Sequence, residues 1–316
     1  MFWVKTLVSA SVGFLIAIIV AICIEKCGGA IGGVISSVPT TIVPTSYVFL
    51  TDSGRTATEQ VESLFAAPIG IIATNLVFLP VWKILPSRLE KRMKNSTVVF
   101  YTLVVSLVMW FVAAILVTWI HELTAKQGMQ LWAFSLIVMA ICVVVGIVLC
   151  WRLPPTPKGT HKVHWYTHIL RGLAAAICIC ISSLLSSSGL GLFAGAFSGF
   201  PAIFSTTMVS VSLAQGASVS TGAVGPMIIG GCAGGWYALI CGALHIYTTW
   251  NVFVCIAVTY VVVVLFWNVP VYFFVKWRRD ETNRMTLPAT TVVPAVSVIP
   301  VTPTPQVEFK EDKPKD

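Results

Sequence analysis

Two prolines within apolar stretches of the 316-residue chain have the clearest chemical consequences of any residues in the sequence. Pro39 and Pro201 each fall near the middle of a run long enough to cross a membrane. A proline removes one backbone donor and displaces the carbonyl four residues earlier, here that of Ile35 or of Phe197. A displaced carbonyl in lipid must find a partner or line a wet cavity. Both prolines therefore predict polar breaks in otherwise apolar helices.

Serine and threonine hydroxyls cluster beside both prolines. Each hydroxyl either bonds a carbonyl of its own helix, which is common, or faces a pocket where it can bind a solute. The sequence leaves both alternatives open. An asparagine also falls in mid-span, where a buried amide needs hydrogen-bond partners. The candidate substrate-pathway residues are Ser36, Pro39, Thr45, Asn75, Ser198, Pro201 and Thr207.

The two proline-containing stretches match each other in sequence. The shared pattern, G-x-x-x-G-x-x-S-x-x-P-x-x-x-x-x-T, begins at Gly29 and again at Gly191. A second match, further along, pairs Pro68 with Pro226 and their apolar neighbours. Order, spacing and position within the span agree, which indicates an internal repeat.

Glycines of the repeated pattern share one helix face because they are four residues apart. Small residues at this spacing let the backbones of two membrane helices approach closely. We expect helix packing at Gly29, Gly33, Gly191, Gly195 and Gly199.

Catalytic and metal-binding patterns are weak. The run from Ser186 to Gly189 superficially resembles an intramembrane serine hydrolase, but the sequence has no G-x-S-G motif and no histidine inside a span, so we expect no enzyme. His161, His164 and His168 would share a helix face, yet no cysteine or carboxylate lies nearby to complete a metal site. The nine cysteines form no C-x-x-C pair and suit packing. We therefore expect no metal and no cofactor.

Charged residues avoid the middle of every apolar run, which argues against a carboxylate proton relay. Sodium bound by carbonyls and hydroxyls, or passive conduction, stays open. The main charged feature on the side of the N-terminus holds Asp52, Arg55, Glu59 and Glu62, and we expect a solvated loop there.

The elements that must position these residues are membrane-spanning helices. The chain is 57% hydrophobic and 10% charged, whereas soluble proteins carry about 25% charged residues. Apolar runs of spanning length without alternation predict helices rather than a barrel. We expect an all-α polytopic membrane protein with about nine spans, near 4–24, 29–50, 65–85, 97–120, 129–151, 166–187, 189–212, 221–246 and 250–276.

Basic residues set the expected orientation. Lys5, Arg55 and Lys126 fall on the side of the N-terminus, and the other basic residues between spans fall on the opposite side. Because cytosolic loops carry the excess of Lys and Arg, the N-terminus is predicted outside or lumenal and the C-terminus cytosolic. The net charge of +8 reflects this pattern, so we expect lipid and not nucleic acid as the partner. A cleavable signal peptide is the alternative for the first span, but its apolar stretch is long and we expect it to be retained.

The repeat and the span count together predict a 4+1+4 architecture. We expect a first four-helix unit over 1–122, a linking helix and cytosolic loop over 123–160, an inverted second unit over 161–280, and a disordered Pro- and Thr-rich tail over 281–316. Inverted repeats occur in many secondary transporters, whose sites lie near mid-membrane at interrupted helices.

The segment from Ala194 to Phe204, AGAFSGFPAIF, resembles the second helix of small four-span bacterial membrane proteins of the GlpM type. The resemblance covers mainly 166–276 and, more faintly, 1–120. It implies a fused, inverted duplication of such a unit, and it implies no substrate and no functional residues.

Two functions follow as hypotheses. The first is a transporter or channel for a small neutral or weakly polar solute, because broken, hydroxyl-lined helices recur in both halves. The alternative is a non-transporting membrane scaffold that holds partners through its cytosolic loops and tail. A cavity between 29–50 and 189–212 would favour transport, whereas a dry glycine seam would favour a scaffold.

Overall fold

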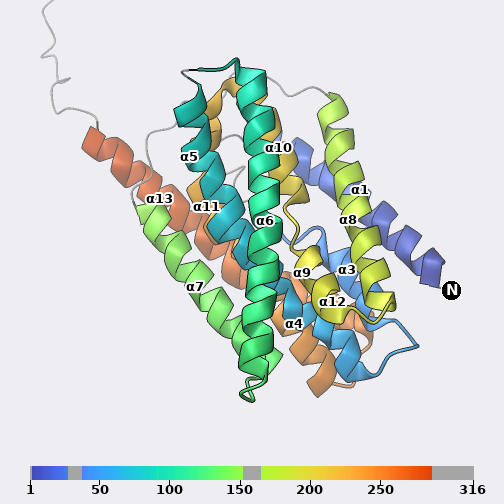
Figure 1. Ribbon diagram of the computed structural model, residues 1–316. Coiled ribbons are helices and arrows are strands. Elements are labelled where there is room, and N and C mark those ends of the chain that lie inside the picture. The colour runs from blue at the N-terminus through green and yellow to red at the C-terminus, as the bar shows by residue number, and fades with distance from the viewer. Residues whose placement is uncertain (1, 28–37, 91, 152–164, 287–316) are drawn as a thin grey trace, which may run out of the picture.

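The computed structural model describes residues 2–27, 38–90, 92–151 and 165–286, and this part of the chain consists of helices and short connections. Eight helices or helix runs in the described residues are long and apolar enough to span a membrane, as expected for an all-α polytopic membrane protein. Figure 1 shows them running between two ends of the molecule, where the connections lie. In chain order the elements are α1 (Phe2–Cys27), α3 (Ile42–Leu50), α4 (Ala57–Ala73), η1 (Thr74–Phe78), α5 (Leu79–Leu89), α6 (Asn95–Ala125), α7 (Leu131–Trp151), α8 (Trp165–Ser187), α9 (Gly191–Ser198), α10 (Ala202–Gln215), α11 (Ala217–Tyr247), α12 (Val252–Val263), η2 (Val264–Asn268) and α13 (Val269–Thr286).

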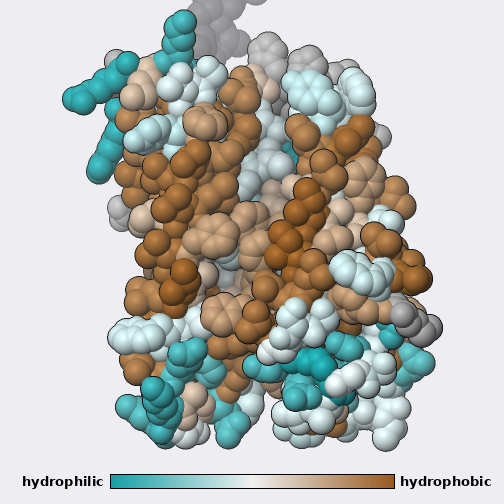
Figure 2. Space-filling model, turned by 45° about the vertical axis from the view of Figure 1, so that its right-hand side comes forward, coloured by the Kyte–Doolittle hydropathy of each residue, from teal (hydrophilic) through white to brown (hydrophobic). Residues whose placement is uncertain are grey.

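The surface has the layered polarity of a membrane protein. Figure 2 shows hydrophobic side chains across the middle of one face and hydrophilic residues gathered towards its two ends. Long apolar side chains such as Ile115, Val148 and Phe266 are 63–76% exposed. Exposure on this scale is stable only against hydrocarbon, so the apolar middle of the surface faces lipid.

The third span is longer than its apolar run, because α4 begins at Ala57 and the helix continues to Leu89. Thr56 caps α4: its backbone N–H donates to Glu59 Oε2 at 2.8 Å, and its hydroxyl accepts from the Glu59 N–H at 3.4 Å. This capping box satisfies backbone donors at the start of the helix. The expected start at residue 65 missed the polar first two turns.

Two π-helical turns, η1 and η2, interrupt the third and ninth spans. Each ends one residue before a Leu-Pro or Val-Pro pair, at Pro80 and Pro270. A proline ring crowds the carbonyl of residue i−4, and widening the preceding turn relieves that crowding. Asn75 lies in η1 and Asn268 in η2, so each widened turn carries a buried amide side chain.

The seventh span, expected over 189–212 with a polar break at Pro201, is interrupted there. Helix α9 ends at Ser198, and α10 begins at Ala202 after the non-helical residues Gly199, Phe200 and Pro201. The Phe197 carbonyl is not left free, because the Phe200 N–H donates to it at 2.9 Å. Pro201, which cannot donate, sits at the N-cap of α10.

The expected second span, 29–50, is described only from residue 38. Residues 38–41 form a bend and a turn, and α3 starts at Ile42. Pro44 lies in the first turn of α3, where its missing N–H costs nothing within the helix. A non-helical segment therefore lies around Pro39, as it does around Pro201.

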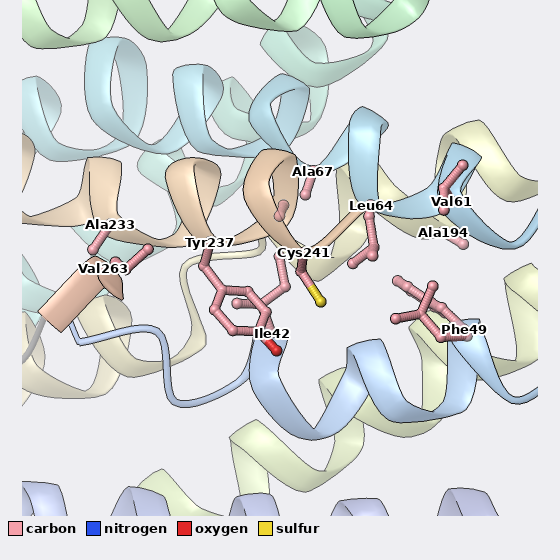
Figure 3. Packing of buried hydrophobic residues seen from close by; sticks show 12 residues of the cluster. Ile42, Phe49, Val61, Leu64, Ala67, Ala194, Ala233, Tyr237, Cys241 and Val263 are labelled. Atoms are coloured by element: carbon pink, nitrogen blue, oxygen red, sulfur yellow. The ribbon is translucent and has the colours of Figure 1, made fainter. Parts of the chain in front are cut away.

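Helices α4 and α11 form the centre of the molecule. In their spans 67% of the most apolar window is buried, against 22–28% for α1, α6 and the α12–α13 span. Figure 3 shows Tyr237 pointing from α11 towards α3, among Ile42, Leu64 and Cys241. Tyr237 and Ser46 are fully buried, and their hydroxyl oxygens are 2.9 Å apart. Short α3 is thus fixed to the centre by apolar packing and one buried hydrogen bond.

Several helices pair with helices distant in the chain. Helix α1 packs against α8, α4 against both α9 and α11, α6 against α10, and α12 against α3. Helix α7 packs on both α4 and α11.

The last helix reaches into the segment expected to be disordered. Residues 281–286 belong to α13, and the Thr282 hydroxyl donates to the Arg278 carbonyl at 2.9 Å. Arg278 in turn donates through Nε to the Trp151 carbonyl at 3.0 Å, which ties α13 to the end of α7. The rest of the expected tail, 287–316, lies outside the described residues.

Candidate functional site: a cavity between two helix breaks

A cavity of about 70 Å³ lies where the two non-helical segments meet. The segment before α3 and the break between α9 and α10 line the cavity, together with residues of α3, α4, η1, α10 and α11. None of the described residues that line it carries a charged side chain. They are Val38, Pro39, Thr40, Thr41, Ile42, Ile71, Thr74, Asn75, Ser198, Gly199, Phe200, Ile203, Phe204, Gly231 and Gly234.

Asn75 is the most polar side chain of the cavity, and it is completely buried. Its Nδ2 donates to Cys232 Sγ at 3.6 Å, while within the described structure its Oδ1 has no hydrogen-bond partner. A Cβ atom added at Gly231 would lie 2.8 Å from this oxygen. The amide oxygen therefore packs directly against Gly231, and both residues line the cavity.

Thr74 links three helices at the break. Its hydroxyl donates to the Gly199 carbonyl at 2.9 Å and accepts from Trp110 Nε1 at 2.8 Å. Trp110 is also within 3.2 Å of the Gly70 carbonyl. These hydrogen bonds run from Trp110 on α6 through Thr74 in η1 to Gly199. They give a partner to the Gly199 carbonyl, which the end of α9 leaves without a helical partner.

Three aromatic rings close the break on the side of α6. Phe197 and Phe200 are stacked with centroids 5.1 Å apart, and Trp110 meets Phe200 edge-on at 5.0 Å. Behind them, an apolar hollow of about 340 Å³ opens between α6, α8 and α9. Apart from Thr118 its lining is apolar, and it suits hydrocarbon rather than a polar solute.

Glycines bring α9 against α4 beside the cavity. A methyl group at Gly195 would overlap the Ser63 carbonyl oxygen, and one at Gly199 would lie 2.8 Å from the Gly70 carbonyl carbon. A methyl group at Gly191 would lie 2.7 Å from Glu62 Oε2. All three positions thus face α4 at close range, whereas Gly29 and Gly33 lie outside the described residues.

Most candidate hydroxyls bond their own helices. Thr45 donates to the Thr41 carbonyl at 2.7 Å, Ser198 to Gly195 at 2.6 Å and Thr207 to Ile203 at 2.7 Å. Thr40 differs: it is 3% exposed, it lines the cavity, and its Oγ1 has no partner within the described structure. The lining of the cavity therefore includes two buried side-chain oxygens, those of Thr40 and Asn75, without partners in the described structure.

The structure brings together three of the candidate pathway residues, Pro39, Asn75 and Ser198. Thr45, Pro201 and Thr207 do not line the cavity, and Ser36 lies outside the described residues. The sequence interpretation did not select Thr40, Thr74, Trp110 or the two lining glycines of α11. A tryptophan in mid-span is a signal that could have found Trp110, because its N–H needs a partner in lipid.

The charged loop on the side of the N-terminus is less solvated than expected. The Arg55 side chain is 10% exposed, 3.5 Å from Glu62 Oε2, and donates to the Ser186 hydroxyl at 2.7 Å. Arg55 therefore joins the loop before α4 to the end of α8. Among the described residues no group of three or more His, Cys, Asp or Glu side chains could hold a metal ion, and His161 and His164 lie outside them.

The fold and the cavity define a class: a polytopic α-helical membrane protein with a small neutral polar cavity where helices are interrupted. No family model, no curated protein and no solved structure matches the chain. The function is therefore argued from the cavity alone.

Proposed function

We propose that this protein is a carrier or channel for a small uncharged solute, which it binds in the cavity between the two helix breaks. The observation that carries the proposal is Asn75, a fully buried amide in the lining of the cavity, whose oxygen has no partner in the described structure. A buried polar atom without a partner costs about 1–3 kcal/mol. A protein can tolerate this free-energy cost at a site where a bound ligand supplies the missing hydrogen bond.

The cavity wall supports an uncharged solute. A formal charge moved into an apolar interior needs an opposite charge or many oriented dipoles, and the described lining residues offer no charged side chain. A volume of about 70 Å³ holds about five to seven water molecules at the roughly 10–15 Å³ of cavity volume that one water needs. The solute is therefore small, with only a handful of heavy atoms.

An inverted repeat would give both faces of the membrane equivalent access to this cavity. The first four spans and the last four form the two units, and α7 links them. Helices α1 and α8 are counterparts that pack on each other, as are α4 and α11, and the contact of α6 with α10 matches that of α12 with α3. These pairings support two related halves that rock about the cavity, the usual form of alternating access. We propose that the N-terminus is outside, because most Lys and Arg residues between spans fall on the opposite side. We propose a fused duplication of a GlpM-type unit because of the sequence repeat and the resemblance of its second half.

A scaffold is the second candidate, supported by the glycine seam between α9 and α4. Close backbone approach at Gly195 and Gly199 gives a rigid, dry contact that needs no solute. The cavity, however, lies directly beside that seam, which a purely structural role leaves unexplained. Solute flux separates the two functions.

The direct experiment reconstitutes the full chain in liposomes and follows uptake of a panel of small neutral solutes by light scattering. Gly234→Leu is the diagnostic variant: a Cβ added there meets only the flexible end of Ile71, at 3.3 Å, so the larger side chain fills the cavity at little structural cost. Ala243→Leu, on the same helix outside the cavity lining, is the matched control.

We expect the unmodified chain and Ala243→Leu to raise uptake of at least one solute above empty liposomes, and Gly234→Leu to abolish that increase. Uptake indistinguishable from empty liposomes for every solute, in properly folded protein, would remove the transport proposal and leave the scaffold.

A further inference from the structure

Resting on the proposed function, we infer that the solute must donate a hydrogen bond, so that the cavity selects small molecules bearing an N–H or O–H group beside an acceptor, such as primary amides, ureas and alcohols. This inference is based on the orientation of the Asn75 side-chain amide.

The hydrogen bonds of Cys232 fix that orientation. The Asn75 NH2 group donates to Cys232 Sγ at 3.6 Å, so the sulfur acts as the acceptor towards Asn75. The Cys232 thiol itself lies 3.5 Å from the Ile228 carbonyl, to which it donates. The other end of the amide, the oxygen Oδ1, lies beside Gly231, which also lines the cavity.

An amide oxygen accepts hydrogen bonds and cannot donate them. A solute with only acceptor atoms would leave Asn75 Oδ1 without a partner and would place a second acceptor near it. A site built to hydrogen-bond a ligand rejects the analogue that lacks the matching group far more strongly than it rejects a change of size. The cavity therefore discriminates by donor content.

The opposite wall accommodates an acceptor. Thr41 and Ile42 at the start of α3, and Ile203 and Phe204 in the first turn of α10, line the cavity. The N-terminal turn of a helix carries backbone N–H groups without helical partners and a partial positive charge. Thr40 adds a hydroxyl that can donate or accept. A carbonyl or hydroxyl oxygen of the solute suits this side.

The test uses acetamide and acetone, which have the same number of heavy atoms and the same planar shape but differ in the N–H donor. Proteoliposomes take up radiolabelled acetamide, and unlabelled acetamide, urea or acetone is added as competitor. We expect acetamide and urea to inhibit uptake and acetone to inhibit about tenfold less effectively. Two results would overturn the inference while leaving transport intact. One is that acetone inhibits as well as acetamide does, and the other is that the protein transports neutral solutes that lack a hydrogen-bond donor but does not transport acetamide.

Two variants assign the effect to the cavity. Asn75→Leu conserves volume and removes the acceptor, and should reduce acetamide uptake about tenfold or more while abolishing the preference over acetone. If Asn75→Leu does not fold, Thr40→Val tests the other wall with a nearly isosteric change. Thr102→Val on α6 is the matched control, because Thr102 is also fully buried with a hydroxyl that lacks a partner in the described structure, but does not line the cavity. Equal uptake by Thr40→Val, Asn75→Leu and Thr102→Val would place selection elsewhere.

If the unmodified protein transports no neutral solute into the liposomes, the proposed function itself is wrong. That result differs from transport without selectivity, which would overturn only the inference about the hydrogen-bond donor.

Discussion

Two neighbouring polar residues, Thr74 and Asn75, have different roles in the site. Thr74 has a structural role, because its hydroxyl accepts from Trp110 and donates to the Gly199 carbonyl. Asn75 bonds Cys232 through its nitrogen and keeps its oxygen for the cavity. The widened turn η1 places both side chains at the break, because both residues belong to it.

Removal of the Thr74 hydroxyl tests the structural role of Thr74. Thr74→Val leaves the Gly199 carbonyl without its donor, and we expect the free energy of unfolding to fall by about 1–3 kcal/mol. The midpoint of thermal unfolding in detergent reports the change. Thr45→Val is the control, since Thr45 bonds only a carbonyl of its own helix that also accepts the Thr45 N–H. Equal shifts in the two variants would contradict the bridging role of Thr74.

The buried hydroxyl pair between α3 and α11 makes a second residue-scale prediction. Tyr237→Phe removes the partner of the Ser46 hydroxyl at 2.9 Å. Because Ser46 also donates to the Val43 carbonyl at 2.7 Å, we expect a loss of only about 1 kcal/mol. Tyr260→Phe, at a 37% exposed tyrosine, should leave the thermal midpoint unchanged. A larger shift for Tyr260 than for Tyr237 would refute the assignment.

At the scale of residues, three of the candidates from the sequence, Pro39, Asn75 and Ser198, line the cavity, whereas Thr45 and Thr207 do not. Asn75 stood out because a mid-span amide needs partners, and it lines the cavity. Thr45 and Thr207 were chosen because they recur in the repeat, yet both bond the preceding turn. Which hydroxyl faces a cavity depends on helix rotation, and a one-dimensional pattern of small and polar residues does not fix that rotation.

At the scale of elements, the decisive features are a complete helix break and a close helix contact. Pro201 predicted a polar break whose Phe197 carbonyl either finds a partner or lines a wet cavity. The carbonyl has a partner, because Gly199 and Phe200 fold into a turn in which the Phe200 N–H donates to it. The turn is possible because Gly199 has no side chain at the crossing with Gly70. Helix crossing and helix termination therefore depend on each other here, and local sequence alone predicts neither fully.

Gly195 tests the close contact between α9 and α4. A methyl group at Gly195 overlaps the backbone oxygen of Ser63, which cannot move without shifting α4. We expect Gly195→Ala to lower stability by about 1–3 kcal/mol and to reduce the fraction of monodisperse protein in size-exclusion chromatography. Gly54→Ala is the control, because its added methyl would make only an ordinary contact of 3.5 Å with Asp52 Oδ1. Matching behaviour of the two variants would argue against a tight α9–α4 crossing.

At the scale of the whole molecule, composition and hydropathy were sufficient to predict an all-α polytopic membrane protein, because lipid permits few alternatives. The expected spans from 97–120 onward correspond to long helices or to the broken pair α9 and α10. Boundaries were less accurate where polar turns extend a helix, as in α4 and α13. Those turns are stabilised by caps and hydrogen bonds rather than by hydrophobicity.

Orientation gives a whole-molecule prediction with an internal control. If the N-terminus is outside, the native sequon at Asn95 faces the cytosol and stays unmodified when the chain is made in endoplasmic reticulum membranes. An Asn-Ser-Thr sequence inserted on a longer loop after Gly128, which connects α6 and α7, should instead be glycosylated. Gel mobility before and after glycosidase treatment reads both sites, and a glycan at Asn95 alone would reverse the proposed orientation.

The central claim is that solutes reach the cavity between the two helix breaks, and thiol accessibility measures this most directly. Thr40→Cys is placed in a chain whose nine cysteines are replaced, and a small membrane-impermeant methanethiosulfonate reagent is applied to intact proteoliposomes. We expect Thr40→Cys to react and a transported solute to slow the reaction, while Thr102→Cys, which is also buried but lies away from the cavity, does not react. A Thr40→Cys variant as inert as Thr102→Cys from both sides of the membrane would show that the contact is closed and dry and that solutes do not reach the cavity.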